Sequence, residues 1–236
     1  MSNLPSENAL IYHWRIRSRD AACSILGNGQ TMQNSLSHLA YLTLEHAIVT
    51  LALQPGAMVT EKDLIDLAGH GRTPVREAIQ KLAWQGLIVV KPRVGLQVAE
   101  IKPTDHENVM QVRRELEPLA AALAADFSTI EQRSELCKCA EAMEKCAVSG
   151  DLAAFFAADK AFDELLEEAC PNSFITSALG PVQTHSRRLW SASAKPDRMD
   201  QSILLHVEVM RAIEQGRPAD AGQSMTRLID YLSGHK

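Results

Sequence analysis

Apolar residues recur at helical spacing from residue 35 onward, and glycine and proline divide the pattern into short helices. The first helical pattern covers residues 35–51 and stops before a Pro-Gly pair. A second begins at Thr60, which forms a capping arrangement with Asp63, and it ends at a Gly-His-Gly turn. The spacing therefore predicts two helices that are separated by short turns.

The next segment carries a third helix and then changes its period. Thr73 is a good N-cap, and Pro74 suits the first helical position because its missing N–H has no intrahelical partner there. Gly86 can end this helix in the left-handed conformation. Residues 87–90 are rich in β-formers, a Pro-Arg-Val-Gly turn follows, and residues 96–101 alternate apolar with mostly polar side chains. This pattern predicts a β-hairpin directly after the helix.

The order helix, helix, turn, helix and hairpin is typical of a winged helix-turn-helix, which is a DNA-binding fold. We assign this domain to residues 35–102. Residues 1–34 show no sustained period, and we interpret them as an N-terminal arm that is disordered unless it docks.

Beyond residue 102 the strand signals disappear, and residues 103–236 predict an all-helical domain. Its six helical stretches cover residues 104–126, 128–148, 151–169, 173–193, 198–215 and 218–233. Ser128 with Glu131 resembles a capping box, and Pro118 should kink or break the first stretch near Glu115. The fold class is therefore mainly α, with a winged helix-turn-helix followed by a six-helix bundle. The interior of such a bundle is a usual place for a ligand cavity.

The composition fits a folded cytoplasmic protein. The chain has 236 residues, of which 46% are hydrophobic, enough to fill a core. No apolar run approaches the ~20 residues that cross a bilayer, and the N-terminus lacks a signal-peptide core, so we expect a cytoplasmic location. The five cysteines show no paired CxxC spacing, which favours buried or bystander thiols over a redox sensor.

The net charge of −5 hides an uneven distribution along the chain. Residues 1–102 carry ten Lys and Arg against eight Asp and Glu, whereas residues 103–236 carry fourteen against twenty-one. The first part is therefore mildly basic and the second clearly acidic. A local excess of basic residues between 62 and 93 is what a DNA-facing surface needs, although charge alone more commonly marks an ordinary solvated face.

A dense motif surrounds the third predicted helix. It consists of Leu53-Gln54-Pro55-Gly56, Leu64, Ala68-Gly69, Arg72-Thr73-Pro74-Val75-Arg76-Glu77-Ala78-Ile79, Leu82, Gly86-Leu87-Ile88 and Gly95. This motif closely resembles the DNA-binding domain of the GntR family of bacterial regulators. One position departs from the family: Gly71 stands where a serine is usual, so a possible cap or phosphate-contacting hydroxyl is missing.

The resemblance implies a role for five residues of the motif. Arg72 and Arg76 are expected to contact bases or phosphates, Thr73 and Pro74 to bring the helix N-terminus to the DNA backbone, and Gly95 to let the wing enter the minor groove. These roles agree with the physics, because a helix N-terminus attracts phosphate and an arginine can bind guanine with two hydrogen bonds.

Other charges near the motif leave alternatives open. Lys62, Lys91 and Arg93 either contact phosphate or belong to a plain solvated surface. The two motif arginines could instead be solvated charges at the helix start that pair with Glu77 or Asp66.

A second, looser resemblance spans residues 104–233. It is carried by Val112-Arg113-Arg114-Glu115-Leu116-Glu117, by residues 159–166 with Asn172, by residues 206–213 and by residues 221–228. These segments resemble the all-helical effector domain of the FadR-like branch, the type called FCD. Six helices rather than seven is typical of the VanR-like subgroup.

Many members of this branch bind a divalent metal such as Zn, Ni or Mn inside the bundle, and here that pattern is altered. The resemblance implies Asp159, Asp163 and His206 as metal ligands, with Asp163 in place of the usual histidine. Leu228 stands where another family histidine belongs, and leucine cannot coordinate a metal. Three interpretations stay open: an altered metal site, a metal-free effector pocket, or solvated carboxylates beside a core histidine.

The resemblance also implies contacts with a small-molecule effector, an organic acid. Arg113 matches a family arginine that often meets the ligand, and inside a bundle it would otherwise need Glu117 or another carboxylate as a partner. His185 and Arg187 either face the cavity and neutralise an anionic effector or form an exposed polar face.

These patterns and the resemblance predict a homodimeric transcription regulator that binds double-stranded operator DNA and responds to the effector. We expect a repressor, and an activator stays open because no sequence feature sets the sign of regulation. A dimer is expected because one recognition helix contacts too few bases to specify a genomic site. A helical metal-dependent hydrolase built on Asp159, Asp163 and His206 is an alternative from another class, but it leaves the winged domain unexplained. A winged-helix module that makes only protein contacts is the third hypothesis. We expect a regulator and no enzyme.

Overall fold

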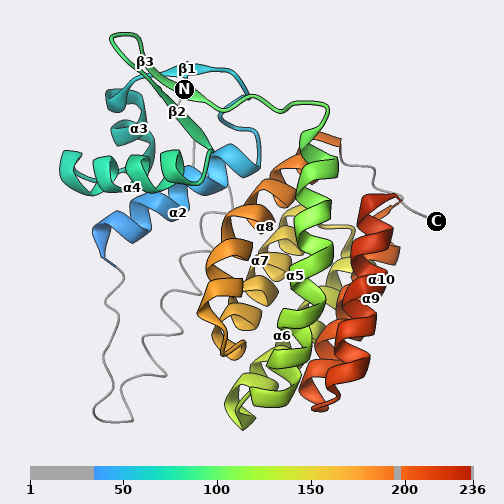
Figure 1. Cartoon of the computed structure of the whole chain (residues 1–236). Helices are drawn as coiled ribbons and strands as arrows, with labels where there is room; N and C mark the ends of the chain where they lie inside the picture. The colour runs from blue at the N-terminus through green and yellow to red at the C-terminus, as the bar shows by residue number, and fades with distance from the viewer. Residues whose placement is uncertain (1–34, 194–197, 235–236) are drawn as a thin grey trace, which may run out of the picture. The chain divides into compact units, whose positions relative to one another are not determined.

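The N-terminal part of the described chain combines three helices with a small sheet. The computed structural model describes residues 35–193 and 198–234, and the arm predicted for residues 1–34 lies outside the described residues. The elements of this part are α2 (Leu36–Val49), β1 (Met58–Val59), α3 (Glu61–Ala68), α4 (Arg72–Trp84), β2 (Ile88–Lys91) and β3 (Gly95–Val98). Their order along the chain confirms the predicted winged helix-turn-helix (Figure 1).

The starts of the two short helices differ in how they are capped. The predicted capping box of α3 is present, because the Thr60 side chain accepts from the Asp63 backbone and the Asp63 carboxylate accepts from the Thr60 backbone. The N-cap predicted for α4 was wrong. The helix begins at Arg72 with Gly71 as its N-cap, so Thr73 already lies within the first turn. No side-chain hydrogen bond caps α4.

The sheet has three antiparallel strands in the order β1-β3-β2. The hairpin of β2 and β3 was predicted, whereas β1 has two residues and is too short to show a period. Gly86 has a φ of +75° after α4, as expected. Gly95 pairs with Lys91 at the start of β3 and has a φ of +137°, a backbone conformation that favours glycine.

The second part of the chain is an all-helical bundle, as predicted. Its helices are α5 (Asp105–Phe127), α6 (Ile130–Ser149), α7 (Leu152–Ala169), α8 (Ser173–Ser193), α9 (Met199–Glu214) and α10 (Pro218–Ser233). The break expected at Pro118 was wrong, because α5 continues through this residue. The capping box expected at Ser128 is shifted by one residue: Thr129 and Gln132 form it, and Ser128 ends α5.

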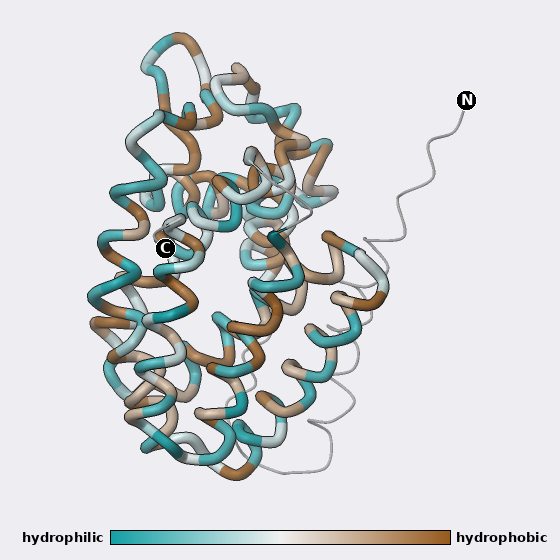
Figure 2. The backbone as a smooth tube through the Cα atoms, turned by 90° about the vertical axis from the view of Figure 1, so that its right-hand side faces the viewer, coloured by the Kyte–Doolittle hydropathy of each residue, from teal (hydrophilic) through white to brown (hydrophobic). Residues whose placement is uncertain are grey.

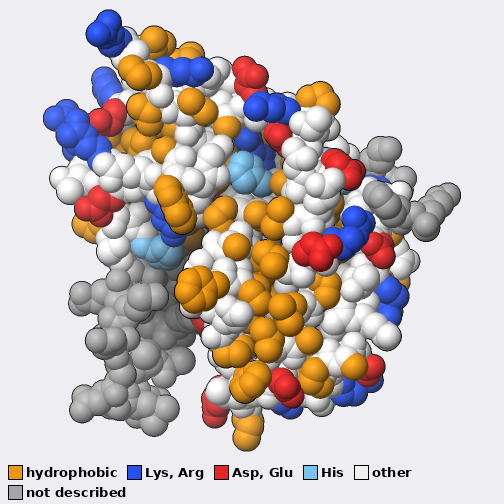
Figure 3. All heavy atoms as spheres, viewed as in Figure 1, with side chains coloured by type: hydrophobic (Ala, Val, Ile, Leu, Met, Phe, Trp, Pro, Cys, Tyr) orange, Lys and Arg blue, Asp and Glu red, His pale blue; other side chains and the backbone are white. Residues whose placement is uncertain are grey.

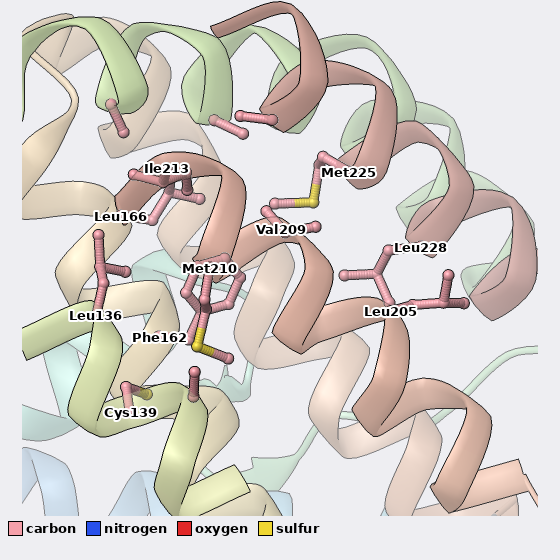
Figure 4. Close-up of a cluster of buried hydrophobic side chains, with 14 of the residues drawn as sticks. Leu136, Cys139, Phe162, Leu166, Leu205, Val209, Met210, Ile213, Met225 and Leu228 are labelled. Atoms are coloured by element: carbon pink, nitrogen blue, oxygen red, sulfur yellow. The ribbon is translucent and has the colours of Figure 1, made fainter. Parts of the chain in front are cut away.

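Two separate hydrophobic clusters stabilise the described chain. The smaller cluster joins α2, α3, α4 and the sheet through residues such as Leu44, Leu64 and Leu82. The larger one fills the bundle, where the helices alternate apolar and polar faces (Figure 2). Leu228 belongs to this core and lies among apolar side chains (Figure 4). Within the described residues, no helix is long and apolar enough to span a membrane.

Candidate DNA-binding surface and ligand pocket

The arginines of the DNA-binding motif project from the start of α4 into solvent. The side chains of Arg72 and Arg76 are 73% and 59% exposed. Both pair with Glu61 of α3: Arg72 Nε lies 3.4 Å from Glu61 Oε1, and Arg76 Nε lies 2.9 Å from Glu61 Oε2. Glu61 therefore takes the place of Glu77 and Asp66, the partners named in the alternative of solvated helix-start charges. Exposed pairs of this kind are weak, and the arginines can exchange Glu61 for DNA phosphates or bases at small cost.

The remaining motif residues surround these arginines. Thr73 and Lys62 are exposed, and half-buried Pro74 lies in the first turn of α4. Because Gly71 provides no side-chain cap, the positive end of the α4 dipole is open to an anion from outside.

The wing carries positive charge at its tip. Lys91 and Arg93 are exposed, and Arg93 has a φ of +66° in the turn between β2 and β3. Gly95 follows and also has a positive φ, so the chain turns back into β3 at a position that has no side chain. Figure 3 shows Lys and Arg side chains gathered over this wing and α3. The start of α4 and the wing are thus both exposed and basic.

A second candidate site lies inside the bundle, where polar side chains of α5, α7, α8 and α9 meet. Its lining residues are Arg113, Phe155, Phe156, Asp159, Asp163, Gln183, Ser186, Arg187, Trp190, Ser202, His206 and Leu232. The space among them measures about 30 Å³, which is room for one or two water molecules. A larger ligand therefore requires side chains of this pocket to move.

Arg113 is held at one end of the pocket by a fully buried ion pair. Its Nε lies 2.8 Å from Glu117 Oε1, its Nη2 lies 3.1 Å from Glu117 Oε2, and its Nη1 donates to Ser186 Oγ at 2.6 Å. Burial opposes the charge of the guanidinium, but Glu117 outweighs it and raises the pKa of Arg113. The partner suggested by the sequence, Glu117, is confirmed.

Arg187 of α8 lies between the two aspartates of α7. One of its amino groups contacts Asp163 directly and lies 3.6 Å from Asp159 Oδ2. Burial raises the pKa of Asp163 to about 7 against the effect of Arg187, and the nearby charges of Asp159 and Glu117 add to this rise. Asp163 therefore changes its charge near neutral pH.

His206 completes the network from α9. Its Nδ1 lies 2.7 Å from the Ser202 carbonyl oxygen, and its Nε2 lies 3.0 Å from Asp159 Oδ1. Both ring nitrogens thus lie against oxygen atoms, one on Ser202 and one on Asp159. Burial alone would raise the pKa of Asp159, but the hydrogen bond and charge of His206 lower it, with help from Arg187 and Arg113.

These residues do not fit a metal ion. Asp159, Asp163 and His206 are brought together as the sequence suggested, but the guanidinium of Arg187 lies against both carboxylates and already supplies the positive charge. Within residues 35–193 and 198–234, no group of three His, Cys, Asp or Glu side chains is arranged to hold a metal. Leu228, packed in the core, offers no ligand.

The structure separates the three candidate effector residues. Arg113 and Arg187 line the pocket, whereas His185 is not among the lining residues, and its Nε2 lies 2.9 Å from the Gln85 carbonyl oxygen. Sequence reasoning missed Gln183, Ser186 and Trp190. Their spacing from Arg187 on one helix could have indicated that all four share a face.

The basic helix-turn-helix surface and the polar pocket of the bundle define a ligand-responsive DNA-binding regulator. Comparison with known proteins gives the family. Residues 36–98 match the model of the bacterial regulatory proteins of the gntR family, and residues 108–231 match the FCD domain. The chain therefore belongs to the GntR family, in the group with an FCD domain, and is a transcription regulator and not an enzyme.

Named relatives support this assignment. The HTH-type transcriptional repressor RspR of Escherichia coli K12 is 31% identical over 195 residues, which cover 82% of this chain and 85% of RspR. A probable D-xylose utilization operon transcriptional repressor of Paenarthrobacter nicotinovorans is 28% identical over 174 residues, covering 74% and 76% of the two chains. The solved structure of E. coli McbR/YncC shares the fold, with a TM-score of 0.71 at 21% identity, over 83% of this chain and 94% of that one.

Proposed function

We propose that this regulator is a homodimeric repressor that binds a near-palindromic DNA operator and releases it when an organic acid enters the bundle. The DNA-binding part is residues 35–102, and the effector-binding and dimerisation part is residues 103–236. The pair of exposed arginines at the uncapped start of α4 is the observation that carries DNA binding. The two relatives described above bear names of repressors, which supports the direction of regulation.

The proposal gives the exposed residues of this surface their roles on DNA. Arg76 lies one turn into α4 and reaches base edges in the major groove, while Arg72, Thr73 and Pro74 meet the backbone at the helix start. Lys62 adds a phosphate contact from α3, and the Gly95 wing contacts the minor groove.

Selection from random duplexes with the full-length protein tests the proposal. We expect enrichment of a site with two related halves, whose affinity falls steeply as the salt concentration rises, because bound phosphates release counterions. Binding of a single half with no salt dependence, or no enrichment at all, would contradict the proposal.

Dimerisation is supported by an exposed apolar stripe along α5. Val112, Leu119 and Phe127 are 40%, 49% and 60% exposed, and partly buried Leu116 and Leu123 lie between them. Their spacing of three and four residues places all five along one side of the helix, a pattern typical of helix pairing. Figure 3 shows apolar side chains gathered over α5 and its neighbours.

Leu119→Glu tests this surface, since it places a charge in the middle of the stripe. We expect the variant to sediment as a monomer, whereas Leu204→Glu, at a somewhat more exposed leucine of α9, should leave a dimer. A dimeric Leu119→Glu protein would move the interface elsewhere.

The pocket supports an organic-acid effector and a metal-free mode of binding. Arg113 and Arg187 supply positive charge, and Phe155, Phe156 and Trp190 supply an apolar wall. The resident guanidinium of Arg187 takes the role that a metal ion would play toward a ligand carboxylate.

A matched pair of probes tests this class of ligand. Benzoate should raise the melting temperature at millimolar concentration, benzamide should not, and removing metals with a chelator should change neither result. Arg187→Gln should abolish the effect of benzoate. A response that requires added Zn²⁺ or Ni²⁺ would contradict the metal-free mode, and a response to benzamide alone would contradict the charge argument.

A further inference from the structure

One helix, α8, takes part in both the pocket and the contact with the winged helix-turn-helix. Gln183, Ser186, Arg187 and Trp190 line the pocket. Thr184, His185 and Arg188, on the adjoining side of the same helix, form hydrogen bonds with Glu45, the Gln85 carbonyl oxygen and the Ala99 carbonyl oxygen. The described residues from Leu36 onward belong to a single unit, so these bonds lie within it.

Three side chains form a continuous path between the two sides of α8. Arg187, which contacts Asp163 in the pocket, donates from Nη2 to Thr184 Oγ1 at 3.2 Å. Thr184 Oγ1 lies 3.1 Å from Glu45 Oε1 in α2. The Thr184 hydroxyl has one proton and also lies 3.1 Å from the Gly180 carbonyl oxygen, and the charged carboxylate is the stronger acceptor.

Glu45 connects this path to α4, the proposed recognition helix. Its side chain is buried, and it also binds Lys160 of α7 and the Tyr41 hydroxyl, which lies 2.6 Å from Oε1. Burial alone would raise the pKa of Glu45, but Lys160 and Arg187 outweigh burial and lower it to about 2, so the carboxylate stays charged. The same Tyr41 hydroxyl lies 3.1 Å from Gln85 Oε1, at the C-terminal cap of α4.

We propose that Arg187 and Thr184 transmit the state of the pocket to Glu45, and so link effector binding to the position of α2 and the recognition helix. This inference rests on the proposed function, because it takes the pocket as the effector site. A ligand carboxylate that binds Arg187 competes with Asp163 and Thr184 for the same guanidinium. Once Arg187 turns away, the Thr184 oxygen no longer accepts a hydrogen bond from the guanidinium. The Thr184 hydroxyl then donates less to Glu45 and more to the Gly180 carbonyl oxygen.

Two other hydrogen bonds join α8 to the winged part, and they do not depend on the pocket. His185 and Arg188 contact backbone carbonyl oxygens and do not line the pocket, so they hold the helix against the winged part whatever the pocket contains. Among the described residues, Thr184 is the α8 side chain that bonds both a pocket residue and α2.

Amide hydrogen exchange on the full-length protein tests the path without an identified ligand. At pH 8, above the pKa of Asp163, the Asp163→Asn change removes the carboxylate charge that holds Arg187 and serves as the perturbation of the pocket. We expect the amides of α2 to exchange roughly three- to tenfold faster in Asp163→Asn than in the wild type, the size of effect that one lost hydrogen bond gives. In the Thr184→Val background, the same Asp163→Asn change should leave exchange in α2 unaltered.

Thr226→Val is the matched control background. Thr226 lies in α10, and its hydroxyl donates to the Gly222 carbonyl oxygen four residues earlier, as that of Thr184 does to Gly180; this backbone bond is not part of the path from Arg187 to Glu45. Asp163→Asn should therefore accelerate exchange in α2 in this background as in the wild type. If it does so equally in the Thr184→Val background, or has no effect on α2 in the wild type, the proposed path is wrong.

Arg187→Lys provides a second perturbation if Asp163→Asn does not fold, because lysine keeps the charge but has a single nitrogen for two partners. The same pattern across the three backgrounds is expected. The selection of duplex DNA separates this inference from the proposed function: an operator without exchange coupling overturns the path alone, and exchange coupling without an operator overturns the function alone.

Discussion

The molecule carries two pairs of arginines in opposite environments, one at the proposed DNA-binding surface and one in the proposed effector pocket. Arg72 and Arg76 lie in solvent and share one half-exposed glutamate, whereas Arg113 and Arg187 are buried and each faces its own carboxylates. An exposed pair contributes about 0–1 kcal/mol, while removing one partner from a buried pair costs several. The first pair is therefore free to exchange its partner for DNA, and the second is committed to holding the bundle until a ligand competes.

The largest expected effect comes from breaking the buried ion pair of Arg113 and Glu117. Glu117→Ala leaves the guanidinium of Arg113 without its carboxylate in the bundle interior. We expect the free energy of unfolding to fall by about 3–5 kcal/mol in urea denaturation. Glu115→Ala, two residues away and exposed, should change it by less than about 0.5 kcal/mol. Equal losses in the two variants would show that burial does not distinguish them.

The next effect concerns the exposed pair. Arg76→Ala should weaken operator binding by about 1–3 kcal/mol, or roughly 5- to 150-fold, while the melting temperature and the dimer stay unchanged. Arg227→Ala removes a comparably exposed arginine that pairs with Glu208 in the bundle, and it should leave operator affinity unchanged. Fluorescence anisotropy with the selected operator measures both. Wild-type affinity for Arg76→Ala would remove the recognition helix from the DNA interface.

The exposed site could be predicted from the sequence because its signals are local. The capping box of Thr60 and Asp63 marks the start of one helix, and the positive φ of Gly86 follows the end of the next. The arginines belong to a short continuous motif. The start of α4 was misplaced by two residues because Thr73 is a better N-cap by composition, yet Gly71 takes that position. Local sequence signals therefore predict that a helix is present and which side chains it carries, but they place its ends only approximately.

The buried site could be predicted only in part, because its partners are far apart in the sequence. The Arg113 and Glu117 pair is one helical turn apart and was foreseen. Arg187 meets Asp163 across two helices; that it could face the cavity was foreseen, but its contact with both aspartates of the suggested metal site was not. Glu45 was missed altogether, although it shares a helical face with Tyr41 and Ile48, which suggests burial.

A third effect, measured as a slope against pH, separates the charge states within the pocket. Asp163 has a folded-state pKa of about 7, above its ordinary value of 3.8, so the folded protein holds a proton that the unfolded chain releases. Stability from this group is complete below about pH 4 and is lost as the pH rises to 7, with a slope of at most about 1.4 kcal/mol per pH unit.

Thermal unfolding from pH 4 to 8 measures this slope. Asp163→Asn is neutral at every pH and should lack this part of the decline, whereas Asp126→Asn, at an exposed position, should retain it. A wild-type slope in Asp163→Asn would mean that Arg187 keeps Asp163 ionised throughout.

The smallest expected effect concerns Glu61, the partner of both arginines at the DNA-facing surface. Glu61 holds both motif arginines at distances of 2.9 and 3.4 Å, so DNA has to displace it. Glu61→Gln keeps the shape, removes the competing charge and lessens repulsion of nearby phosphates. Operator affinity should therefore rise by about 0.2–1 kcal/mol, a factor below roughly sixfold, with the gain largest at low salt. Glu77→Gln, on the exposed side of α4 and outside this pair, is the control. An affinity that falls in Glu61→Gln would mean that the glutamate positions the arginines for DNA and does not compete with it.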